Sequence, residues 1–350
     1  MGRWRCHRRS AHRDLAFAHH ALDGRAAARA WHSWQPTAGR GWARRAGYYW
    51  TYNLLKAATL WDAAKAAGFA TAAVTWPVTV DAPITWNLLE YFLRRQGGAM
   101  DLAAIESKST PGLVASIAAK YPSFRQQCLD DRTRAFATMY LLTEKRPAFT
   151  AVHFVDLDAE EHDTEPFSPA SNAMLEWTDE LIGNILRVLP ADTAPALVSD
   201  HGFIPVNKTV ALKTLLKEAG SVNVTPFLVS TTDASVAAKL AELRKDPANG
   251  IGRAIPAAEW KQFMPDTPQP LAIYEPADGY LFSPAPSGAL YGKPYEIGTH
   301  GYWPGRPGPR ATFILNGPSI RAAKLGELSM LEIAPRLARA LGIEFHPGPR

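Results

Sequence analysis

Acidic and imidazole side chains stand together where a short apolar run ends. The run from Pro195 to Val198 is typical of a buried strand, and Asp200, His201 and Gly202 follow it closely. A carboxylate and an adjacent imidazole at the tip of a strand can both bind one hard or borderline cation. Gly202 lets the backbone turn away without a side chain in the way. This pattern favours a metal site at the end of the strand.

Two further segments supply the same types of ligand. Asp158 and His162 are four residues apart and follow the apolar segment from Ala151 to Val155, so we expect Asp158 in the loop that leaves a strand. His300 lies in a second loop, between glycines. Two Asp and three His residues together predict most of a two-metal hydrolase site. The candidate metal ligands are Asp158, His162, Asp200, His201 and His300.

Each segment also has a simpler interpretation. The acidic residues around Asp158 are typical of a solvated surface, and Asp156 is a rival for the carboxylate role. Asp200 can end a polar strand and cap a helix, and a lone loop histidine such as His300 is usually a surface residue. His153 lies within an apolar run, so we interpret it as a core residue and not as a ligand.

Helical and strand patterns alternate along the segments that must position these residues. This alternation predicts an α/β fold with a mainly parallel central sheet flanked by helices. Residues 204–295 lack it and contain many prolines, so we interpret them as an inserted region of helices and short strands that shapes a substrate cleft. The expected helices are Thr59–Ala67, Asp130–Lys145, one that begins at Ser168 and ends before Pro190, and one between Ser329 and Gly342; the expected strands are Phe69–Thr75, Phe149–Val155, one that ends at Ser199, and Ala311–Leu315.

Charge is distributed unevenly along the chain. The whole sequence has a formal net charge of +5, but residues 1–46 contain ten Arg and two Asp, a net of +8, which leaves about −3 for residues 47–350. The main part is therefore mildly acidic, which argues against nucleic-acid recognition based on charge. No stretch is long and apolar enough to predict a membrane span. The basic start lacks the apolar region of a secretory signal peptide, so localisation stays open.

The first 46 residues have an unusual composition. Residues 1–45 contain no Lys, Glu, Asn, Ile, Val or Tyr, but they contain five of the ten His and four of the eleven Trp residues. A basic disordered arm or a transit peptide rarely carries so much Trp. The third interpretation is an out-of-frame translation of GC-rich DNA. With a shift of one nucleotide, the codons of Asp14 to Gln35 are compatible with a peptide that contains Thr-x-Pro-Ser-His. We therefore hypothesise that residues 1–46 are disordered or out of frame.

Three motifs, in order, resemble the type I phosphodiesterase/nucleotide pyrophosphatase family of the alkaline phosphatase superfamily. They are Asp158-x-x-x-His162 followed by Glu165-Pro166-Phe167, then Ser199–Gly202, and then Gly298–Tyr302. Similar context lies in Thr75–Val78 and Phe313–Pro318, and the resemblance covers about residues 47–345. The resemblance implies an alkaline phosphatase-like domain over residues 47–350, with the insert at about 204–295.

The resemblance also implies a cofactor of two Zn²⁺ ions. By position, Asp158, His162 and His300 are expected to hold one ion, and Asp200 and His201 to hold the other. In the family, an Asp at the end of the first strand and a Thr or Ser nucleophile at a helix start complete the second site. Neither motif occurs in the chain as written, so we expect the first strand and the nucleophile helix to be missing and the second site to be incomplete.

Two classes of function follow from the resemblance. The first is a metal-dependent hydrolase of phosphodiester or nucleotide pyrophosphate bonds, impaired here by the loss of the nucleophile. Its expected partner is a small phosphodiester or nucleotide, while phosphomonoesters, phosphonates and sulfate esters stay open. The alternative is a pseudoenzyme or truncated remnant that at most binds zinc. Whether the chain is an active enzyme is therefore left undecided by the sequence.

Overall fold

A computed structural model describes residues 44–45, 48–90, 102–125, 130–217, 220–261, 269–285, 287–308 and 310–348. Most of the atypical first segment lies outside the described residues, so its disorder and its out-of-frame origin stay predictions. The chain divides into two compact units. Unit 1 comprises residues 1–159, 173–200 and 312–350, and unit 2 comprises residues 160–172 and 201–311.

Unit 1 contains a three-stranded parallel sheet in the order β4-β3-β5. All four residues of the central strand β3 are buried, as expected for a strand covered on both faces. The parallel sheet predicted from the sequence is confirmed. The elements of this unit are β1 (Arg44–Arg45), β2 (Tyr48–Tyr49), α3 (Leu60–Ala66), β3 (Thr71–Val74), β4 (Trp86–Leu88), α4 (Leu102–Lys108), α5 (Leu113–Lys120), α6 (Asp131–Tyr140), β5 (Phe149–Val152), the first residues of α7 (Asp156–Thr164), all but the first residues of α8 (Pro169–Leu186), β6 (Ala196–Val198), β15 (Phe313–Leu315) and α12 (Ile333–Leu341), with short turns at Tyr52–Leu54, Pro122–Arg125, Leu141–Lys145 and Met330–Glu332.

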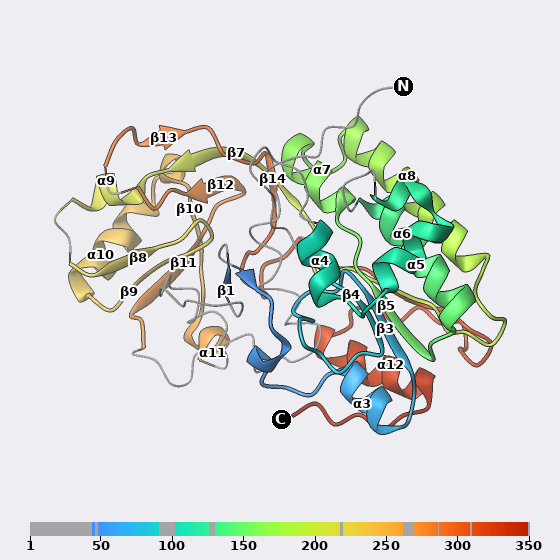
Figure 1. Ribbon diagram of the computed structural model, residues 1–350. Helices are drawn as coiled ribbons and strands as arrows, with labels where there is room; N and C mark the ends of the chain where they lie inside the picture. Colours follow the sequence, from blue (N-terminus) through green and yellow to red (C-terminus); the bar gives the residue numbers. More distant parts are fainter. Residues whose placement is uncertain are drawn as a thin grey trace. The chain divides into compact units, whose positions relative to one another are not determined.

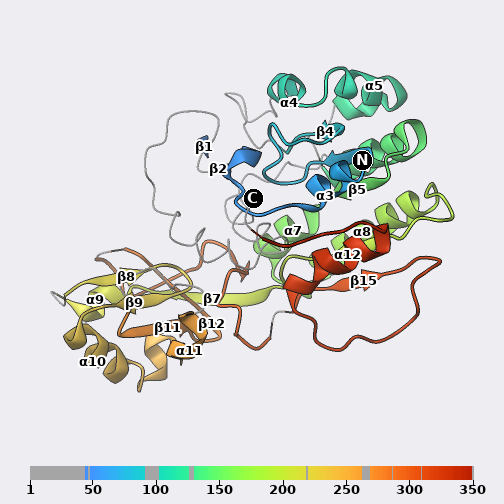
Figure 2. The same ribbon diagram turned by 90° about the horizontal axis from the view of Figure 1, so that it is seen from below.

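Helices cover the parallel sheet of unit 1 on two sides. Figure 2 shows α4 and α5 on one side of strands β3 and β4 and α12 on the other. On the first side, Val114 and Ile117 of α5 pack with Val74 of β3 in the largest apolar cluster of the described residues. On the other side, helices α3 and α12 pack together through residues such as Leu60 and Ala334 (Figure 1). The expected α/β architecture is therefore present.

Several local predictions in unit 1 are confirmed by their capping residues. Thr59 forms a capping box with Asp62 at the start of α3, because each side chain accepts a hydrogen bond from the other residue's backbone. Helix α6 is followed by one π-helical turn that ends at Lys145. Together they cover nearly the whole predicted helix, Asp130–Lys145. The last helix, α12, ends at Gly342 with a φ of 74°, a conformation that glycine adopts readily.

Two predictions about the ligand-bearing segments are wrong in detail. Strand β6 was expected to be buried, but its residues are half-buried or exposed, and the side chain of Val198 is 38% exposed. Among the described residues, β6 pairs with β15 alone, in an antiparallel ladder. Asp158 was expected in a loop, but it lies in the first turn of α7, because that helix begins at Asp156, soon after β5 ends at Val152.

Unit 2 contains short helices and strands over most of residues 204–295, while their origin as an insert stays a prediction. One of its sheets is antiparallel, in the order β10-β11-β9-β8, and in the other strand β7 pairs with β12, β13 and β14. Its main core joins the two sheets to helix α10 through residues such as Val210, Val229 and Leu240. The elements of this unit are β7 (Ile204–Val210), α9 (Leu212–Leu216), β8 (Val222–Val224), β9 (Val229–Thr231), α10 (Ala234–Leu243), β10 (Ile251–Ala254), α11 (Ala257–Trp260), β11 (Ala272–Pro276), β12 (Gly279–Phe282), β13 (Tyr291–Gly292) and β14 (Gly298–Thr299), with a short turn at Pro247–Asn249.

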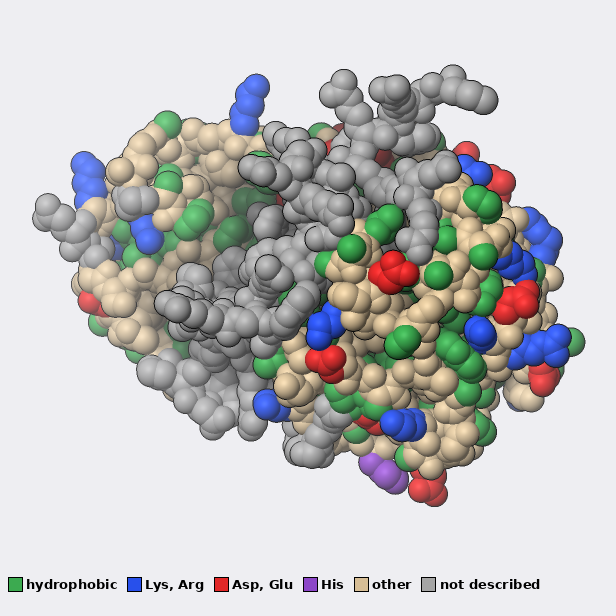
Figure 3. Space-filling view, in the orientation of Figure 1, with side chains coloured by type: hydrophobic (Ala, Val, Ile, Leu, Met, Phe, Trp, Pro, Cys, Tyr) green, Lys and Arg blue, Asp and Glu red, His purple; other side chains and the backbone are tan. Residues whose placement is uncertain are grey.

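The described surface and helices add two observations. On the face drawn in Figure 3, both basic and acidic side chains occur among the described residues. Within the described ranges, every helix is too short or too polar to cross a lipid bilayer.

Candidate metal centre

Helix α7 carries the first two candidate ligands. Asp158 lies in its first turn, and His162 follows four residues later, so both side chains project from the same side of the helix. His162 is the one described residue of α7 that is fully buried. Both residues belong to the same continuous helix, Asp156–Thr164.

The strand segment before His300 fixes the orientation of the His162 ring. Nδ1 of His162 lies 2.9 Å from the carbonyl oxygen of Gly298 and 3.2 Å from a carboxylate oxygen of Glu296. A carbonyl oxygen only accepts hydrogen bonds, so Nδ1 carries the proton and Nε2 presents a lone pair when the ring is neutral. A histidine ligand is commonly held by such a partner on its other ring nitrogen.

A close backbone approach explains why glycine occupies position 298. The backbone N–H of Ile297 donates to the carbonyl oxygen of His162 at 3.0 Å, which joins β14 to the end of α7. A Cβ atom at Gly298 would lie 2.1 Å from the carbonyl oxygen of Glu161. Any larger residue would therefore push β14 away from α7 and disturb the bond that orients His162.

Nε2 of His162 faces Nε2 of His300 at a distance of 3.2 Å. Both rings are buried, with 0% and 1% of the residues exposed. Two nitrogen ligands at zinc distances in a tetrahedral site are about 3.3 Å apart. The spacing of these two nitrogens therefore fits a shared cation.

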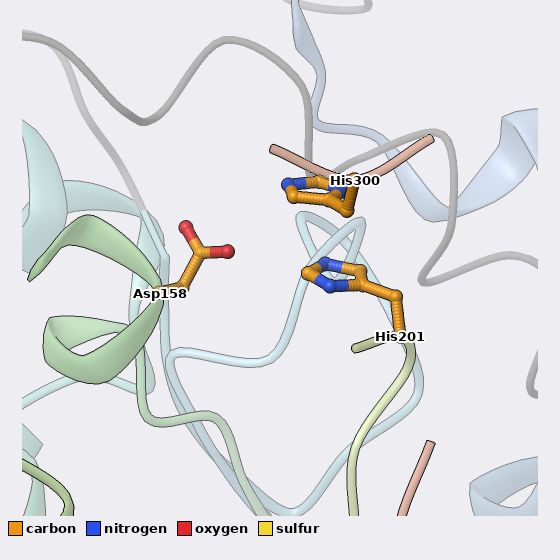
Figure 4. Close-up of side chains that lie close together, drawn as sticks. All are labelled: Asp158, His201 and His300. Atoms are coloured by element: carbon orange, nitrogen blue, oxygen red, sulfur yellow. The ribbon is translucent and has the colours of Figure 1, made fainter. Parts of the chain in front are cut away.

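His201 and Asp158 complete the group around His300. The rings of His201 and His300 are stacked, with centroids 3.5 Å apart and planes 6° from parallel. The ligand atoms of Asp158, His201 and His300 all lie within 4.8 Å of one another. In Figure 4 the carboxylate of Asp158 is directed toward the two imidazole rings. One carboxylate and imidazoles at this spacing are a suitable donor set for zinc.

Asp200 has a different environment from His201, its neighbour in the chain. It is not part of the group of described residues formed by Asp158, His201 and His300. Its charge instead acts on His153 at the end of β5, whose Nδ1 lies 3.1 Å from a carboxylate oxygen of Glu90. Burial opposes the charged form of this ring, but Glu90 and Asp200 outweigh burial and raise the pKa of His153.

Two residues that the sequence analysis missed contact this group. The ring of Phe203 lies edge-on to three imidazoles, with centroid distances of 4.8 Å to His162, 5.5 Å to His201 and 5.1 Å to His300. Glu296, only 6% exposed, lies beside Nδ1 of His162. The only sequence signal for them is their closeness in the chain to His201 and His300.

Comparison with known families identifies the family of the chain. The profile of the type I phosphodiesterase/nucleotide pyrophosphatase family matches residues 25–303. The chain belongs to this family. The matched range contains all five candidate ligands, and it begins within the atypical first segment. A comparison with curated proteins finds no significant match.

Solved structures with a similar fold include members of this family. Human ectonucleotide pyrophosphatase/phosphodiesterase 5 has a TM-score of 0.54 at 16% identity, over 85% of this chain and 74% of that chain. An inactive form of the murine protein in complex with AMP has a TM-score of 0.52 at 15% identity, over 84% and 72%. Phosphonoacetate hydrolase from Sinorhizobium meliloti, in complex with phosphonoformate, has a TM-score of 0.50 at 17% identity, over 83% and 76%. At these identities the likeness concerns the fold, and it agrees with the predicted alkaline phosphatase-like architecture.

Proposed function

We propose that the chain is a metal-dependent hydrolase that acts on phosphodiester or nucleotide pyrophosphate bonds. Membership of the family supports a hydrolase of this general kind. The observation that carries the metal dependence is the pair of Nε2 atoms of His162 and His300, 3.2 Å apart, with Asp158 and His201 beside them. Zinc is the proposed metal, because imidazole and carboxylate ligands in this arrangement suit it.

The proposed ligand sets follow the order of the motifs. Asp158, His162 and His300 hold one ion, and Asp200 and His201 contribute to the other. The stacking of His201 on His300 supports a close spacing of the two sites. When bound, two such cations supply charge stabilisation to the attacking and leaving oxygens of an in-line displacement.

The residues of the chain have defined roles in this proposal. The Gly298 carbonyl holds the proton on Nδ1 of His162, so that Nε2 stays available as a ligand. The Phe203 ring is in T-shaped contact with all three imidazoles, which limits their rotation. Both effects favour a preorganised site in which neutral imidazole and ionised carboxylate bind the metal, so binding weakens in acid.

The proposed substrate is a small phosphodiester or nucleotide. Similar solved structures contain AMP in the murine protein and phosphonoformate in the bacterial one, which are small anions with phosphorus oxygens. Insert residues of unit 2 are the proposed source of specificity, since loops and inserted regions commonly shape clefts.

A second candidate is a remnant that binds zinc without catalysis. The sequence lacks the full Thr-x-Pro-Ser/Asn-His motif that carries the nucleophile in the family, so we propose that turnover is impaired. The exposure of Val198 on β6 and Ile314 on β15, 38% and 53%, supports the loss of a neighbouring strand from the sheet. The complete second site of an active relative would then be absent.

Metal binding and turnover of the full chain distinguish these candidates. We expect dialysed protein to bind zinc or cobalt, and His300→Ala to lose that binding. His346→Ala is the matched control, because His346 is 91% exposed and lies near the end of the chain. Hydrolysis of bis-nitrophenyl phosphate by the metal-loaded chain supports the enzyme, and metal binding without hydrolysis supports the remnant. Equal metal affinity of His300→Ala and wild type contradicts both.

A further inference from the structure

The first residues of helices α6 and α7 cap each other's helix. Oδ1 of Asp131 accepts the backbone N–H of Val155, and Oδ2 accepts that of Asp156, both at 2.9 Å. In return, Oδ2 of Asp156 accepts the backbone N–H of Asp131 at 2.9 Å. Since the first N–H groups of a helix have no partner inside it, this exchange satisfies both helix starts with one pair of carboxylates.

Arg134 balances the charge of the two carboxylates. One guanidinium nitrogen lies 2.9 Å from Oδ1 of Asp131 and 3.7 Å from Oδ1 of Asp156. The side chains of Arg134 and Asp131 are only 2% and 0% exposed. A buried ion pair of this kind is a weak source of stability, because removing both charges from water costs about as much as their attraction returns. How this ion pair fixes the positions of its neighbours is therefore more informative than its contribution to stability.

The same network holds the strand that leads to α7. Nε of Arg134 donates to Oγ1 of Thr75 at 3.0 Å, and Thr75 Oγ1 donates to the carbonyl oxygen of His153 at 3.0 Å. Thr75 has a φ of 49°, a strained conformation for a β-branched residue that surrounding contacts must maintain. The side chains of α6 and of Thr75, the residue that follows β3, thus fix the backbone on both sides of the turn from β5 into α7.

Helix α7 has little apolar packing to hold it in place. Its sequence, Asp156 to Thr164, is mostly acidic and polar, and His162 is its one buried residue. Its position therefore depends on contacts at its two ends. One end is capped by Asp131, and the other is joined to β14 through the backbone of His162.

We propose that Asp131, with Arg134, is a positioning residue for the metal centre. By fixing the start of α7, it sets the positions at which Asp158 and His162 present their ligand atoms. This inference rests on the proposed function, because it assumes that these two residues bind metal. Neither Asp131 nor Arg134 needs to touch the metal for this effect.

Metal affinity of Asp131→Asn tests the proposal against a neighbouring control. Asn keeps the size of the side chain but loses one of the two acceptor oxygens that cap α7. Asp130→Asn is the matched control, because Asp130 accepts from the N–H of Thr133 and caps α6 itself, not α7. Titration with Co²⁺ measures affinity and the visible spectrum reports ligand geometry, while thermal melting reports stability separately.

We expect Asp131→Asn to lower Co²⁺ affinity about 10-fold to 100-fold and to change the spectrum, as changes beside metal ligands do. Asp130→Asn is expected to keep wild-type affinity and a melting temperature close to that of wild type, because asparagine caps a helix about as well as aspartate. Wild-type affinity and spectrum in Asp131→Asn, with wild-type protein binding Co²⁺, overturn this inference alone. Failure of the wild-type chain to bind Co²⁺ overturns the proposed function as well. If Asp131→Asn does not fold, Arg134→Lys decides, since it keeps the charge and loses the fixed link to Thr75; unchanged affinity there also overturns the inference.

Discussion

Two strands lead to the candidate ligands, and they differ in how firmly they are held. Strand β5 pairs with the buried strand β3 over four residues, and the turn that follows it is tied to α6 by Asp131. Strand β6 pairs with β15 alone among the described residues, and its last residue, Val198, is 38% exposed. Carboxylate and imidazole ligands thus follow both strands, but β5 is well supported by its neighbours and β6 is poorly supported.

The difference suggests that the two proposed metal sites are unequal. Asp158 and His162 stand on a helix fixed at both ends, and His162 is oriented by Gly298. Asp200 follows β6 and lies outside the group formed by Asp158, His201 and His300. We therefore expect one tight metal equivalent that depends on α7 and a second, weaker one that depends on the end of β6.

We expect the largest change in metal affinity when one candidate ligand is removed after each strand, His162 after β5 or Asp200 after β6. His162→Ala should lower the affinity of the tight metal equivalent at least about 100-fold, more than a change beside a ligand does. Asp200→Ala should leave the tight equivalent unchanged and remove the weak one. Titration with zinc and a competing chelator measures both. If Asp200→Ala weakens the tight equivalent as much as His162→Ala, the proposed inequality is wrong.

Crowding the contact between β14 and α7 should disturb the tight site without removing a ligand. Gly298→Ala places a Cβ 2.1 Å from the Glu161 carbonyl oxygen, so backbone must shift. We expect a loss of about 1–3 kcal/mol in the free energy of unfolding, together with weaker metal binding. Gly183→Ala in α8 is the control, because its Cβ meets nothing closer than 3.7 Å and alanine favours helix. Urea unfolding and metal titration of both variants provide the measurement.

Truncating one apolar side chain in each strand compares their packing directly. Val74 in β3 is 0% exposed and Val198 in β6 is 38% exposed. Val74→Ala should lower the free energy of unfolding by about 2 kcal/mol, and Val198→Ala by less than about 1 kcal/mol. Urea unfolding at one pH gives both values. Equal losses would mean that β6 is packed as well as β3 and would remove the basis of the comparison.

A further expected effect concerns pH and the caps of α7. Burial, and next the charge of Asp131, raise the pKa of Asp156 from 3.8 to about 6. A raised carboxyl pKa means that the folded state binds the proton more tightly, so stability is highest below about pH 4 and falls as pH rises through about 6. In the metal-free protein we expect this group to contribute a decrease of about 1–2 kcal/mol, discounted for its partial exposure.

Asp156→Asn tests this pH dependence. Its amide oxygen still accepts the N–H of Asp131, and the side chain has no charge to gain. Unfolding by urea at a series of pH values between about 4 and 7 should show a smaller decrease for the variant than for wild type. The same decrease in both proteins would assign the pH dependence to other groups.

Local signals in the sequence predicted the elements that carry their own caps and apolar periods. Thr59 and Asp62 at the start of α3, the long pattern of α8, and Gly342 at the end of α12 are examples. The residue types of the candidate ligands and their spacing in the chain also predicted them. The grouping of Asp158, His201 and His300 depends on contacts between distant segments, which no local pattern encodes.

The errors of the sequence analysis arose where tertiary contacts decide the outcome. Asp158 lies in a helix and not in a loop because Asp131, far away in the chain, caps the start of α7. Strand β6 has an apolar sequence that predicts burial, but its exposure depends on which strands lie beside it. Phe203 and Glu296 were missed because an apolar ring and a lone acid have no spacing that marks a metal site.

X-ray absorption of the zinc-loaded full chain tests the central claim most directly. We expect at least one tightly held zinc ion per chain, with imidazole nitrogens in its coordination shell at about 2.0–2.1 Å and a lower imidazole count in His162→Ala. Zinc that is lost on dialysis, or a shell of oxygen ligands that His162→Ala does not change, would contradict the account.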